Sequence, residues 1–522
     1  MPADCPRATL PGVRRAILAA SAASIVFAFP GSSRANGRFP AANQLVFAPS
    51  DPNFVVLRTT YAVLPSSDNG ATWRYLCEGV LGLPSDQGED PSIGVMADDS
   101  LLAGVAGYVG GGLGVSVSAD RGCNWNCIGG GLAHQSVVDI AVRPDTPTSA
   151  VAITGTYEMS DSATAIQYSQ IFETTDNGKT WAPIGTPIDP TVMATTIDVA
   201  KSDPQRIYVT GTRGLGSVRT ASLFVTADRG NTWVEKPIPQ FNASQELAVY
   251  IGAVDPNNAD RVYLRSSALV TGGQSRLYFT TNAGADAGTT FSLGSSLPDD
   301  GAFNVEAGGA NDITGELLGL ALSPDGSKIY VGTVEAGLWM ASTSDMVFRQ
   351  KNPNVRVKCL AARNAELWAC SDIDSGFVVG ESLDDGATFM PKMHYVSSLC
   401  GPVECAPNPG GSLGCGATDN ASSCGSAYQS FCQNDDQAMV CGSCGGDGGT
   451  APDAATAPSR DGGAAVAASL DAGAGPRATL SSSSSCGCSV VGGRGATGLA
   501  AVLAFTGMAL QRRRASRRRA RR

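Results

Sequence analysis

The sequence predicts an all-β protein built from seven repeated units. An octapeptide, Ser66-Ser-Asp-Asn-Gly-Ala-Thr-Trp73, recurs along much of the chain at intervals of 52 to 56 residues. Between its copies lie short runs rich in Val, Ile, Tyr and Thr, bounded by Gly, Asn, Asp and Pro, which is the pattern of short strands joined by tight turns. Units of about 50 residues with four short strands each are typical of propeller blades, so we expect a seven-bladed β-propeller.

Five copies of the octapeptide follow the pattern Ser/Thr-x-Asp-x-Gly-x-Thr/Asn-aromatic. Each copy contributes one Asp, one Gly and one aromatic residue: Asp68, Gly70 and Trp73; Asp120, Gly122 and Trp125; Asp176, Gly178 and Trp181; Asp228, Gly230 and Trp233; Asp384, Gly386 and Phe389. The pattern resembles the Asp-box of sialidase-like (BNR) repeats. In related folds the Asp-box lies on the blade periphery, away from the ligand face, so the resemblance implies a structural role for these residues.

The residue types of the box fit a turn between two strands. Asp and Asn side chains bond to their own backbone and tolerate left-handed geometry, and Gly supplies positive φ. The aromatic residue begins the last strand of a unit, where it can fill the wedge between neighbouring blades. We therefore interpret Trp73, Trp125, Trp181 and Trp233 as core residues and not as platforms for sugars.

Two weaker copies complete the count of seven. One covers residues 280–284, and Asn282 lies 54 residues after Asp228. The 102 residues between Asn282 and Asp384 correspond to about two periods, and a decayed copy lies at 337–348. A second motif with Asp and Pro, as in 50–57 and 202–209, precedes most boxes. Each unit therefore reads strand, Asp-Pro turn, strand, loop, strand, Asp-box turn, strand, and the units fill residues 36–395.

Residues 1–35 have the pattern of a secretory signal peptide. Arg14 and Arg15 precede a short apolar run at 16–29, and a small-x-small end follows at Ser33-Arg34-Ala35. The apolar run is short for a membrane span. We expect export through the Sec route and cleavage near Ala35; a retained anchor is the alternative.

The C-terminal part divides into three segments. Residues 396–445 are rich in Cys and poor in apolar residues, so we expect a disulfide-stabilised stalk or small binding module, and 446–485 read as a low-complexity linker. Residues 486–522 contain Cys486-Gly-Cys488, a short apolar helix and an Arg-rich end, an order that resembles the MYXO-CTERM sorting tag of myxobacterial surface proteins. The resemblance implies processing at Cys486 or Cys488 and anchorage at the cell surface. A plain transmembrane helix is the alternative.

Export implies an oxidising compartment, so the cysteines that follow the signal peptide are expected to form disulfides. Cys359 and Cys370 fall on what read as neighbouring strands of the last blade, and we predict that they pair. Cys77 and Cys123 are the next predicted pair, with Cys127 as a competitor for either partner. The propeller and the Cys-rich segment each hold an odd number of cysteines, which allows one bond to join them. No metal or cofactor site is expected.

The charge distribution limits the partners. The overall net charge is −10, but the two ends are basic. The first 35 residues carry a net charge of +3 and residues 489–522 carry +9, so the net charge of the residues between them is −22. A body this acidic argues against nucleic acid or anionic lipid as its partner.

The pattern of a sialidase active site is missing from the repeats. Such an enzyme needs three Arg that clamp a carboxylate, an acidic Asp, and a Tyr activated by a Glu. There is no Phe-Arg-Ile-Pro segment near the start, and sialidases typically have six blades. The arginines that could be nominated, at ordinary strand and turn positions, are Arg58, Arg143, Arg206, Arg213, Arg219 and Arg261. His134 and His394 lack the local pattern of a catalytic triad.

We therefore predict no catalytic residue. The expected function is that of a monomeric, surface-anchored, non-catalytic module that binds a glycan or a surface protein at the mouth of the central channel. In size the chain is similar to the photosystem II assembly factor type, a single non-enzymatic propeller. A glycoside hydrolase of sialidase type is the alternative.

Overall fold

The computed structural model describes residues 42–81, 90–106, 114–128, 130–133, 135–159, 165–270, 273, 275–284, 315–394, 398–405 and 424–432. All of them belong to the second of the two units of the chain, 35–522. The predicted signal peptide, the linker 446–485 and the sorting tag 486–522 with Cys486 and Cys488 lie outside the described residues. No helix within the described ranges is long and apolar enough to cross a membrane.

The described strands form a seven-bladed β-propeller. Blades 1 to 4 contain β1 (Ala42–Phe47), β2 (Val55–Thr59), β3 (Val63–Ser66) and β4 (Trp73–Tyr75); β5 (Ser92–Val95), β6 (Leu101–Val105), β7 (Gly114–Ser118) and β8 (Asn126–Cys127); β9 (Val137–Val142), β10 (Ala150–Thr154), β13 (Ile171–Thr174) and β14 (Ala182–Ile184); β15 (Met193–Val199), β16 (Ile207–Arg213), β17 (Thr220–Thr226) and β18 (Val234–Pro237). Blades 5 to 7 contain β19 (Glu246–Val254), β20 (Val262–Ala268) and β21 (Leu277–Thr280); β22 (Leu317–Leu322), β23 (Lys328–Thr333), β24 (Gly337–Ser342) and β25 (Arg349–Asn352); β26 (Cys359–Arg363), β27 (Glu366–Cys370), β28 (Val379–Ser382) and β29 (Met390–Met393).

Blades 2 to 7 are antiparallel sheets whose strands follow one another in chain order, as in β15-β16-β17-β18. In blade 1 the sheet is β1-β2-β3, and the segment of β4 joins it through one antiparallel bridge between Val63 and Leu76. Blade 3 carries an additional hairpin, β11 (Thr156–Met159) with β12 (Ala165–Tyr168), between β10 and β13. The short 3₁₀ helices are η1 (Glu78–Leu81), η2 (Gly130–Leu132), η3 (Gly216–Val218) and η4 (Ile373–Ser375). In blade 5 the residues that follow the box, 285–314, lie outside the described part. The predicted order of strands and turns is confirmed in the six units whose four strands are described, including the decayed sixth unit.

The strand order gives the ring two different faces. Because neighbouring strands run in opposite directions, the first-to-second and third-to-fourth connections of a blade lie on the same side. This side, which we call the turn face, carries the Asp-Pro turns and the Asp-boxes. The other side, the loop face, carries the second-to-third connections and the links between blades. Longer and more variable segments, such as the β11–β12 hairpin, belong to the loop face.

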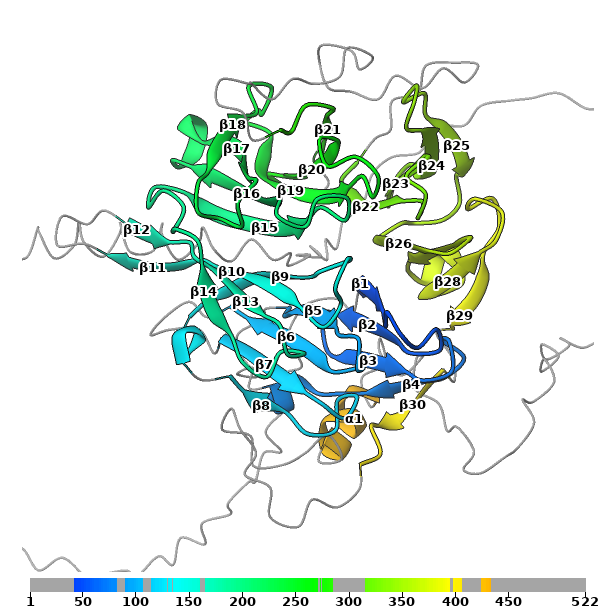
Figure 1. The fold of residues 1–522 in the computed structure, drawn as a ribbon. Helices are drawn as coiled ribbons and strands as arrows, with labels where there is room; N and C mark the ends of the chain where they lie inside the picture. The colour runs from blue at the N-terminus through cyan, green and yellow to red at the C-terminus, as the bar shows by residue number, and fades with distance from the viewer. Residues whose placement is uncertain are drawn as a thin grey trace, which may run out of the picture. The chain divides into compact units, whose positions relative to one another are not determined.

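The ring closes where blade 7 meets blade 1, because β26 and β27 contact β1 as each inner strand contacts the next around the ring (Figure 1). Arg363 links the two blades directly. It donates to the carbonyl of Pro52 at 2.7 Å and to Oδ1 of Asn69 at 2.8 Å. Its guanidinium also lies over the rings of Phe47 and Trp368, which meet edge to face with centroids 5.5 Å apart. The sequence did not reveal this seam.

A segment from the C-terminal part completes blade 1. Its strand β30 (Leu399–Pro402) pairs in parallel with β4, and the helix α1 (Gly425–Cys432) contacts β30 (Figure 1). The hydroxyl of Tyr428 donates to the carbonyl of Leu399 at 2.9 Å. We call residues 398–405 and 424–432 the C-terminal strap. The described part of the Cys-rich segment thus packs against the propeller and does not project from it as the stalk that the sequence suggested.

Three disulfides have both partners within the described residues. Cys359 and Cys370 are bonded, as the sequence predicted for two directly opposed residues of β26 and β27. The predicted bond between Cys77 and Cys123 is wrong, because Cys77 pairs with Cys424 and Cys123 with Cys405. Cys77 follows the end of β4, whereas Cys123 precedes the start of β8, so the two lie at opposite ends of the outer strands of adjacent blades. Cys127 and Cys400 are also disulfide-bonded.

The apolar core of the described region lies mainly between the blades. Its largest cluster surrounds the seam and combines residues of blades 1, 2 and 7 with the strap, among them Trp73, Trp368 and Cys424, none of which is exposed. The amide of Trp73 donates to the carbonyl of Ser398, and its indole Nε1 to the carbonyl of Lys392. One box tryptophan therefore ties the first blade both to the last blade and to the strap.

Candidate functional site

The Asp-box turns use their polar groups internally. In blade 1 the hydroxyl of Ser66 donates to Oδ1 of Asp68 at 2.8 Å and accepts from the amide of Gly70 at 2.9 Å. Thr72 donates its amide to Oδ1 and its hydroxyl to Oδ2 of Asp68, at 2.8 and 2.6 Å. The same bonds recur at Asp120, Asp176, Asp228 and Asp384. Because both carboxylate oxygens stabilise the turn, these aspartates serve the scaffold.

The hydrogen bonds also stabilise the ionised form of the box carboxylates. The hydroxyl and the amide of Thr388 lower the pKa of Asp384 to about 2. The hydroxyl of Thr226 and the amide of Thr232 likewise lower the pKa of Asp228. A carboxylate held in its charged form by hydrogen bonds is poorly suited to act as an acid or base near neutral pH.

The aromatic residues of the boxes pack between blades. Trp73, Trp125 and Trp181 are buried, whereas Trp233 and Phe389 are half-buried against their clusters. These positions agree with the interpretation of the box aromatics as core residues.

The residue between the Asp and the Gly of each box has a role that the sequence did not reveal. It adopts a left-handed conformation in all five good copies, with φ between 55° and 59°, at Asn69, Arg121, Asn177, Arg229 and Asp385. In four of them the side chain contacts the preceding blade. Asn69 accepts from Arg363 of blade 7, and Arg121 pairs with Asp51 of blade 1 at 2.7 Å.

The other two contacts follow the same direction around the ring. Arg229 of blade 4 pairs with Glu173 of blade 3, and Asp385 of blade 7 accepts from Lys328 and Tyr330 of blade 6. The box therefore also locks each of these blades to the one before it. The only sequence signal was a charged or amide side chain directly after the box Asp.

The arginines considered for a carboxylate clamp are not brought together. Three of them form ion pairs near the turn face: Arg143 with Glu173, Arg206 with Asp203 and Asp260, and Arg261 with Asp255. Two lie near the loop face, where Arg213 forms ion pairs with Asp189 and Glu235 and Arg219 donates to the carbonyl of Glu246. Arg58 donates to Asn43 and to the carbonyl of Pro91. Each guanidinium is engaged in its own part of the ring.

One Tyr–Glu pair is present, but it lies inside blade 5. The hydroxyl of Tyr278 on β21 is 2.6 and 2.8 Å from the two carboxylate oxygens of Glu246 on β19, and neither residue is exposed. Burial, and then the charge of Glu246, raise the pKa of Tyr278 above its usual range. A tyrosine that attacks a substrate must reach it and lose its proton. This pair does neither and instead joins the inner strand to the third strand.

The inner strands are joined from blade to blade by side-chain hydrogen bonds. Ser92 of β5 donates to Asp139 of β9 at 2.9 Å, and Asp139 accepts from the amide of Ile197 of β15 at 3.1 Å. Thr195 and Thr196 of β15 bond to the backbone of β19. These polar groups of the inner wall are therefore used to connect strands.

Asp198 is an acid on the same inner strand, β15, as Thr195 and Thr196. Burial, opposed by a hydrogen bond from the amide of Val199 and supported by the charge of Asp139, raises the pKa of Asp198 to about 7. Its protonated form is thus favoured in the folded protein relative to the unfolded chain. The associated stability is fully present below the unfolded pKa near 3.8 and is lost as the pH rises through about 7.

Asp198→Asn should therefore flatten the pH dependence of stability. Between pH 5 and 7 the unfolding free energy of the wild type should decline more steeply than that of the variant, by up to about 1.4 kcal/mol per pH unit. Urea unfolding at several pH values measures this difference. Asp325→Asn is the control, because the hydroxyl of Ser323 and the groups of Ser327 hold the pKa of Asp325 at about 2, below the window. Parallel profiles for Asp198→Asn and wild type would contradict the assignment.

Exposed aliphatic side chains distinguish the loop face of blades 4 and 5. Leu215 and Val218, in the β16–β17 loop, are 54% and 75% exposed, and Leu269 and Val270, in the β20–β21 loop, are 37% and 66% exposed. We call these four residues the aliphatic patch. On the same face, Tyr168 at the end of β12 in blade 3 is 45% exposed. Exposed aliphatic groups that gather on one surface often mark an interaction site.

The two loops of the patch rest on a common support. The amide of Leu269 donates to the carbonyl of Gln245 at 2.7 Å, and Nη1 of Arg219 donates to the carbonyl of the next residue, Glu246, at 3.0 Å. The Tyr278 hydroxyl holds the side chain of Glu246 from within the blade. The patch is therefore presented by hydrogen-bonded loops over a fully buried polar pair.

No metal site is found among the described residues. They contain no group of three or more His, Cys, Asp or Glu placed to hold a metal ion. The amide of His394 donates to the hydroxyl of Ser398 at 2.8 Å, and His134 lies outside the described residues.

One family model matches part of the chain. The Sortilin-Vps10 family model (sortilin, neurotensin receptor 3) matches residues 114–237. This match covers less than half of the chain and runs from β7 to β18, which includes three Asp-box turns. No curated protein matches the sequence.

Solved structures give distant matches. The GH74 enzyme of Niastella koreensis is 14% identical with a TM-score of 0.35, and the match covers 69% of this chain and 66% of that one, just under two thirds of its length. YCF48 from Cyanidioschyzon merolae is 13% identical with a TM-score of 0.41, over 64% of this chain and 93% of that one. YCF48 bound to D1 peptide is 15% identical with a TM-score of 0.40, over 64% and 89%. At these values the likenesses carry no information about function.

Proposed function

We propose that this chain is an exported, surface-anchored propeller that binds a protein partner through the loop face of blades 4 and 5. The observation that carries the proposal is the aliphatic patch, Leu215, Val218, Leu269 and Val270, all of which are more than a third exposed. Burying such side chains against a partner removes apolar surface from water, which is the main favourable term in most protein association.

The distribution of polar groups supports this choice of face. On the turn face the box carboxylates are bonded within their turns, and their neighbours are bonded between blades. A protein partner is favoured over a glycan because the four exposed side chains of the patch are aliphatic and offer no hydrogen-bonding group to a sugar hydroxyl. The sialidase-type alternative receives no support from the described residues, where the nominated arginines are dispersed and the Tyr–Glu pair is buried. Export and surface anchorage rest on the sequence patterns of the two termini.

The test compares the two faces on the same protein. The double variant Leu215→Ser/Val218→Ser changes the patch, and Leu383→Ser/Met390→Ser is the matched control, since Leu383 and Met390 are 68% and 55% exposed on the turn face of blade 7. Both variants should fold normally because the residues are exposed. The full chain is applied to arrays of envelope proteins and of glycans.

We expect binding to a protein of the array, weakened at least about tenfold by the patch variant and unchanged by the control, because two buried aliphatic contacts are lost. Equal weakening by both variants would contradict the choice of face. Binding to glycans alone, or failure to bind anything on either array, would contradict the proposed function.

A further inference from the structure

The three disulfides described above differ in how open they are to solvent. Cys370 and Cys424 are not exposed to solvent, and Cys359 is only 6% exposed. Two of the bonds, Cys359–Cys370 and Cys77–Cys424, therefore have at least one sulfur enclosed in the core. In Cys123–Cys405, by contrast, both residues are partly exposed. A reagent in solution can reach this bond without unfolding the core.

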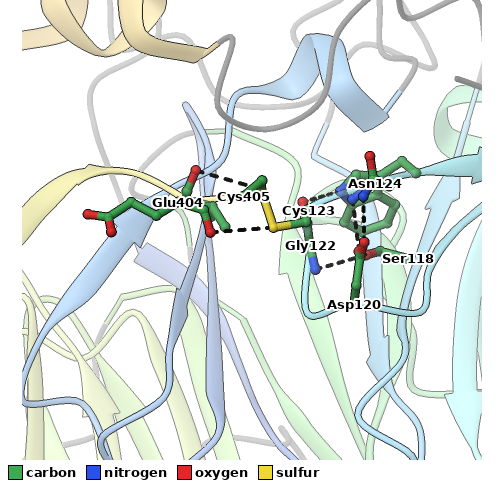
Figure 2. Close-up of a disulfide and its surroundings, with 9 residues drawn as sticks. Ser118, Asp120, Gly122, Cys123, Asn124, Glu404 and Cys405 are labelled. Carbon is green, nitrogen blue, oxygen red and sulfur yellow. Dashed lines mark hydrogen bonds between the residues drawn. A yellow bond between two sulfur atoms is a disulfide. The ribbon is translucent and has the colours of Figure 1, made fainter. Parts of the chain in front are cut away.

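The accessible bond borders a surface pocket of about 360 Å³. The pocket lies between the boxes of blades 1 and 2, and its lining includes Asp68, Arg74, Asp120, Cys123, Val403 and Glu404. Figure 2 shows the disulfide between the turn of blade 2 and the end of the strap, with the side chain of Glu404 directed away from that turn. The box itself is closed by bonds from Ser118 and Asn124 to Asp120.

We propose that Cys123–Cys405 is a selectively reducible disulfide that latches the end of the C-terminal strap over this pocket. Its substrate chemistry is thiol–disulfide exchange with a dithiol reductant. A thiolate of the reductant attacks one sulfur, forms a mixed disulfide with it and releases the other as a thiolate, which takes up a proton. The second thiol of the reductant then displaces the protein sulfur, so that the reductant becomes a disulfide and the protein gains two electrons and two thiols.

The contacts around the bond confine the release to the end of the strap. Beyond Pro402, the amide of Val403 donates to the carbonyl of Tyr75 at 3.1 Å, and Arg74 pairs with Glu404 at 2.7 Å. The Glu404 side chain is 79% exposed, so this ion pair holds the segment only weakly. Val403 is 9% exposed within the cluster at the seam. With the disulfide open, residues 403–405 are held only by these apolar contacts and the two bonds above, and Val403 and Glu404 leave the pocket wall.

The rest of the strap stays in place after this reduction. β30 remains paired with β4, the hydroxyl of Tyr428 remains bonded to Leu399, and Cys424 remains bonded to Cys77 in the core. Reduction of this disulfide therefore changes the wall of the pocket on the turn face, while the ring stays closed. The latch acts on the opposite face from the aliphatic patch and does not depend on the proposed function.

Graded reduction of the full, folded chain tests the selectivity. The protein is incubated with increasing dithiothreitol under native conditions, alkylated and mapped by mass spectrometry. We expect Cys123 and Cys405 to be alkylated together at a reductant concentration at least tenfold below that needed for Cys359, Cys370, Cys77 or Cys424. Reduction of either enclosed bond at the same or a lower concentration would overturn the proposal.

Hydrogen exchange tests the latch itself. The selectively reduced protein and the variant Cys123→Ser/Cys405→Ser should both show at least tenfold faster exchange at the amide of Val403, with exchange in β30 unchanged. The variant Cys359→Ser/Cys370→Ser, which removes a bond within blade 7, should leave Val403 protected. Unchanged protection of Val403 in the reduced protein would show that the bond holds nothing in place and would overturn the latch.

Discussion

Replacing Cys77 and Cys424 together by serine is expected to lower the unfolding free energy by about 4 kcal/mol. The bond joins residues 347 positions apart and attaches the strap to the first blade. With Cys123–Cys405 intact, the additional loop that it closes in the unfolded chain has about 65 residues, because the path runs from 77 to 123 and from 405 to 424. Losing the bond therefore releases a large amount of chain entropy in the unfolded state.

Equilibrium unfolding in guanidinium chloride measures this effect. The control is Cys359→Ser/Cys370→Ser, whose bond spans 11 positions and should contribute about 3 kcal/mol. The two variants should also affect different parts of the molecule, since only Cys77→Ser/Cys424→Ser should raise the rate of hydrogen exchange in β30 and α1. Equal protection of β30 in the two variants, together with a smaller loss of stability for Cys77→Ser/Cys424→Ser, would show that the strap does not depend on this bond.

Trp73→Ala is expected to destabilise the protein by about 4 kcal/mol, within the range for large aromatic residues in a packed core. Trp73 is not exposed, and it packs in the cluster at the seam between blade 7 and blade 1. The substitution also removes the indole donor to Lys392, and it leaves a cavity where blade 1, blade 7 and the strap meet.

The repeat supplies a matched control at Trp233, the equivalent residue of blade 4. Trp233 is half-buried, and its indole donates to Thr186 of the preceding connection. Trp233→Ala should therefore cost about half as much, because less apolar surface is buried there. The comparison is made by urea unfolding of the two variants. Equal losses would mean that the seam is no more tightly packed than an ordinary junction between blades.

The blades could be predicted from the sequence because the information is local. Each Asp-box is a short segment in which Ser or Thr, Asp, Gly and a second hydroxyl or amide residue bond to one another. Even in the sixth unit, β24 forms the first part of the decayed copy at 337–348 and β25 follows it directly. Cys359 and Cys370 could also be paired, since they lie on adjacent strands separated by a short turn.

The closure of the ring could not be predicted in this way. Arg363 contacts Pro52 and Asn69 across about three hundred residues, and the strap reaches β4 across a similar distance. No local periodicity marks such contacts. The expected pairing of Cys77 with Cys123 failed for the same reason. The odd cysteine counts allowed a bond between the propeller and the Cys-rich segment, but no local pattern showed that the strap passes beside both Cys77 and Cys123.

The candidate site was predicted only as the mouth of the central channel, on the face away from the Asp-boxes that the resemblance to sialidase-like repeats implied. The strand order does place the Asp-boxes and the second-to-third loops on opposite sides of the ring. The four residues of the aliphatic patch could not be selected from the sequence, since Leu and Val in a strand-rich chain are usually buried. Their exposure follows from the β16–β17 and β20–β21 loops, whose geometry depends on bonds to Gln245 and Glu246.

The turn face holds the ring together, and the loop face is the proposed binding surface. Hydrogen exchange of the full chain, with and without the protein captured on the array, distinguishes these two roles. We predict that the bound partner slows exchange in peptides covering 214–219 and 265–270, and leaves the Asp-box peptides 67–72 and 383–388 unchanged. Slower exchange in the Asp-box peptides, with none at 214–219 or 265–270, would contradict this assignment of roles.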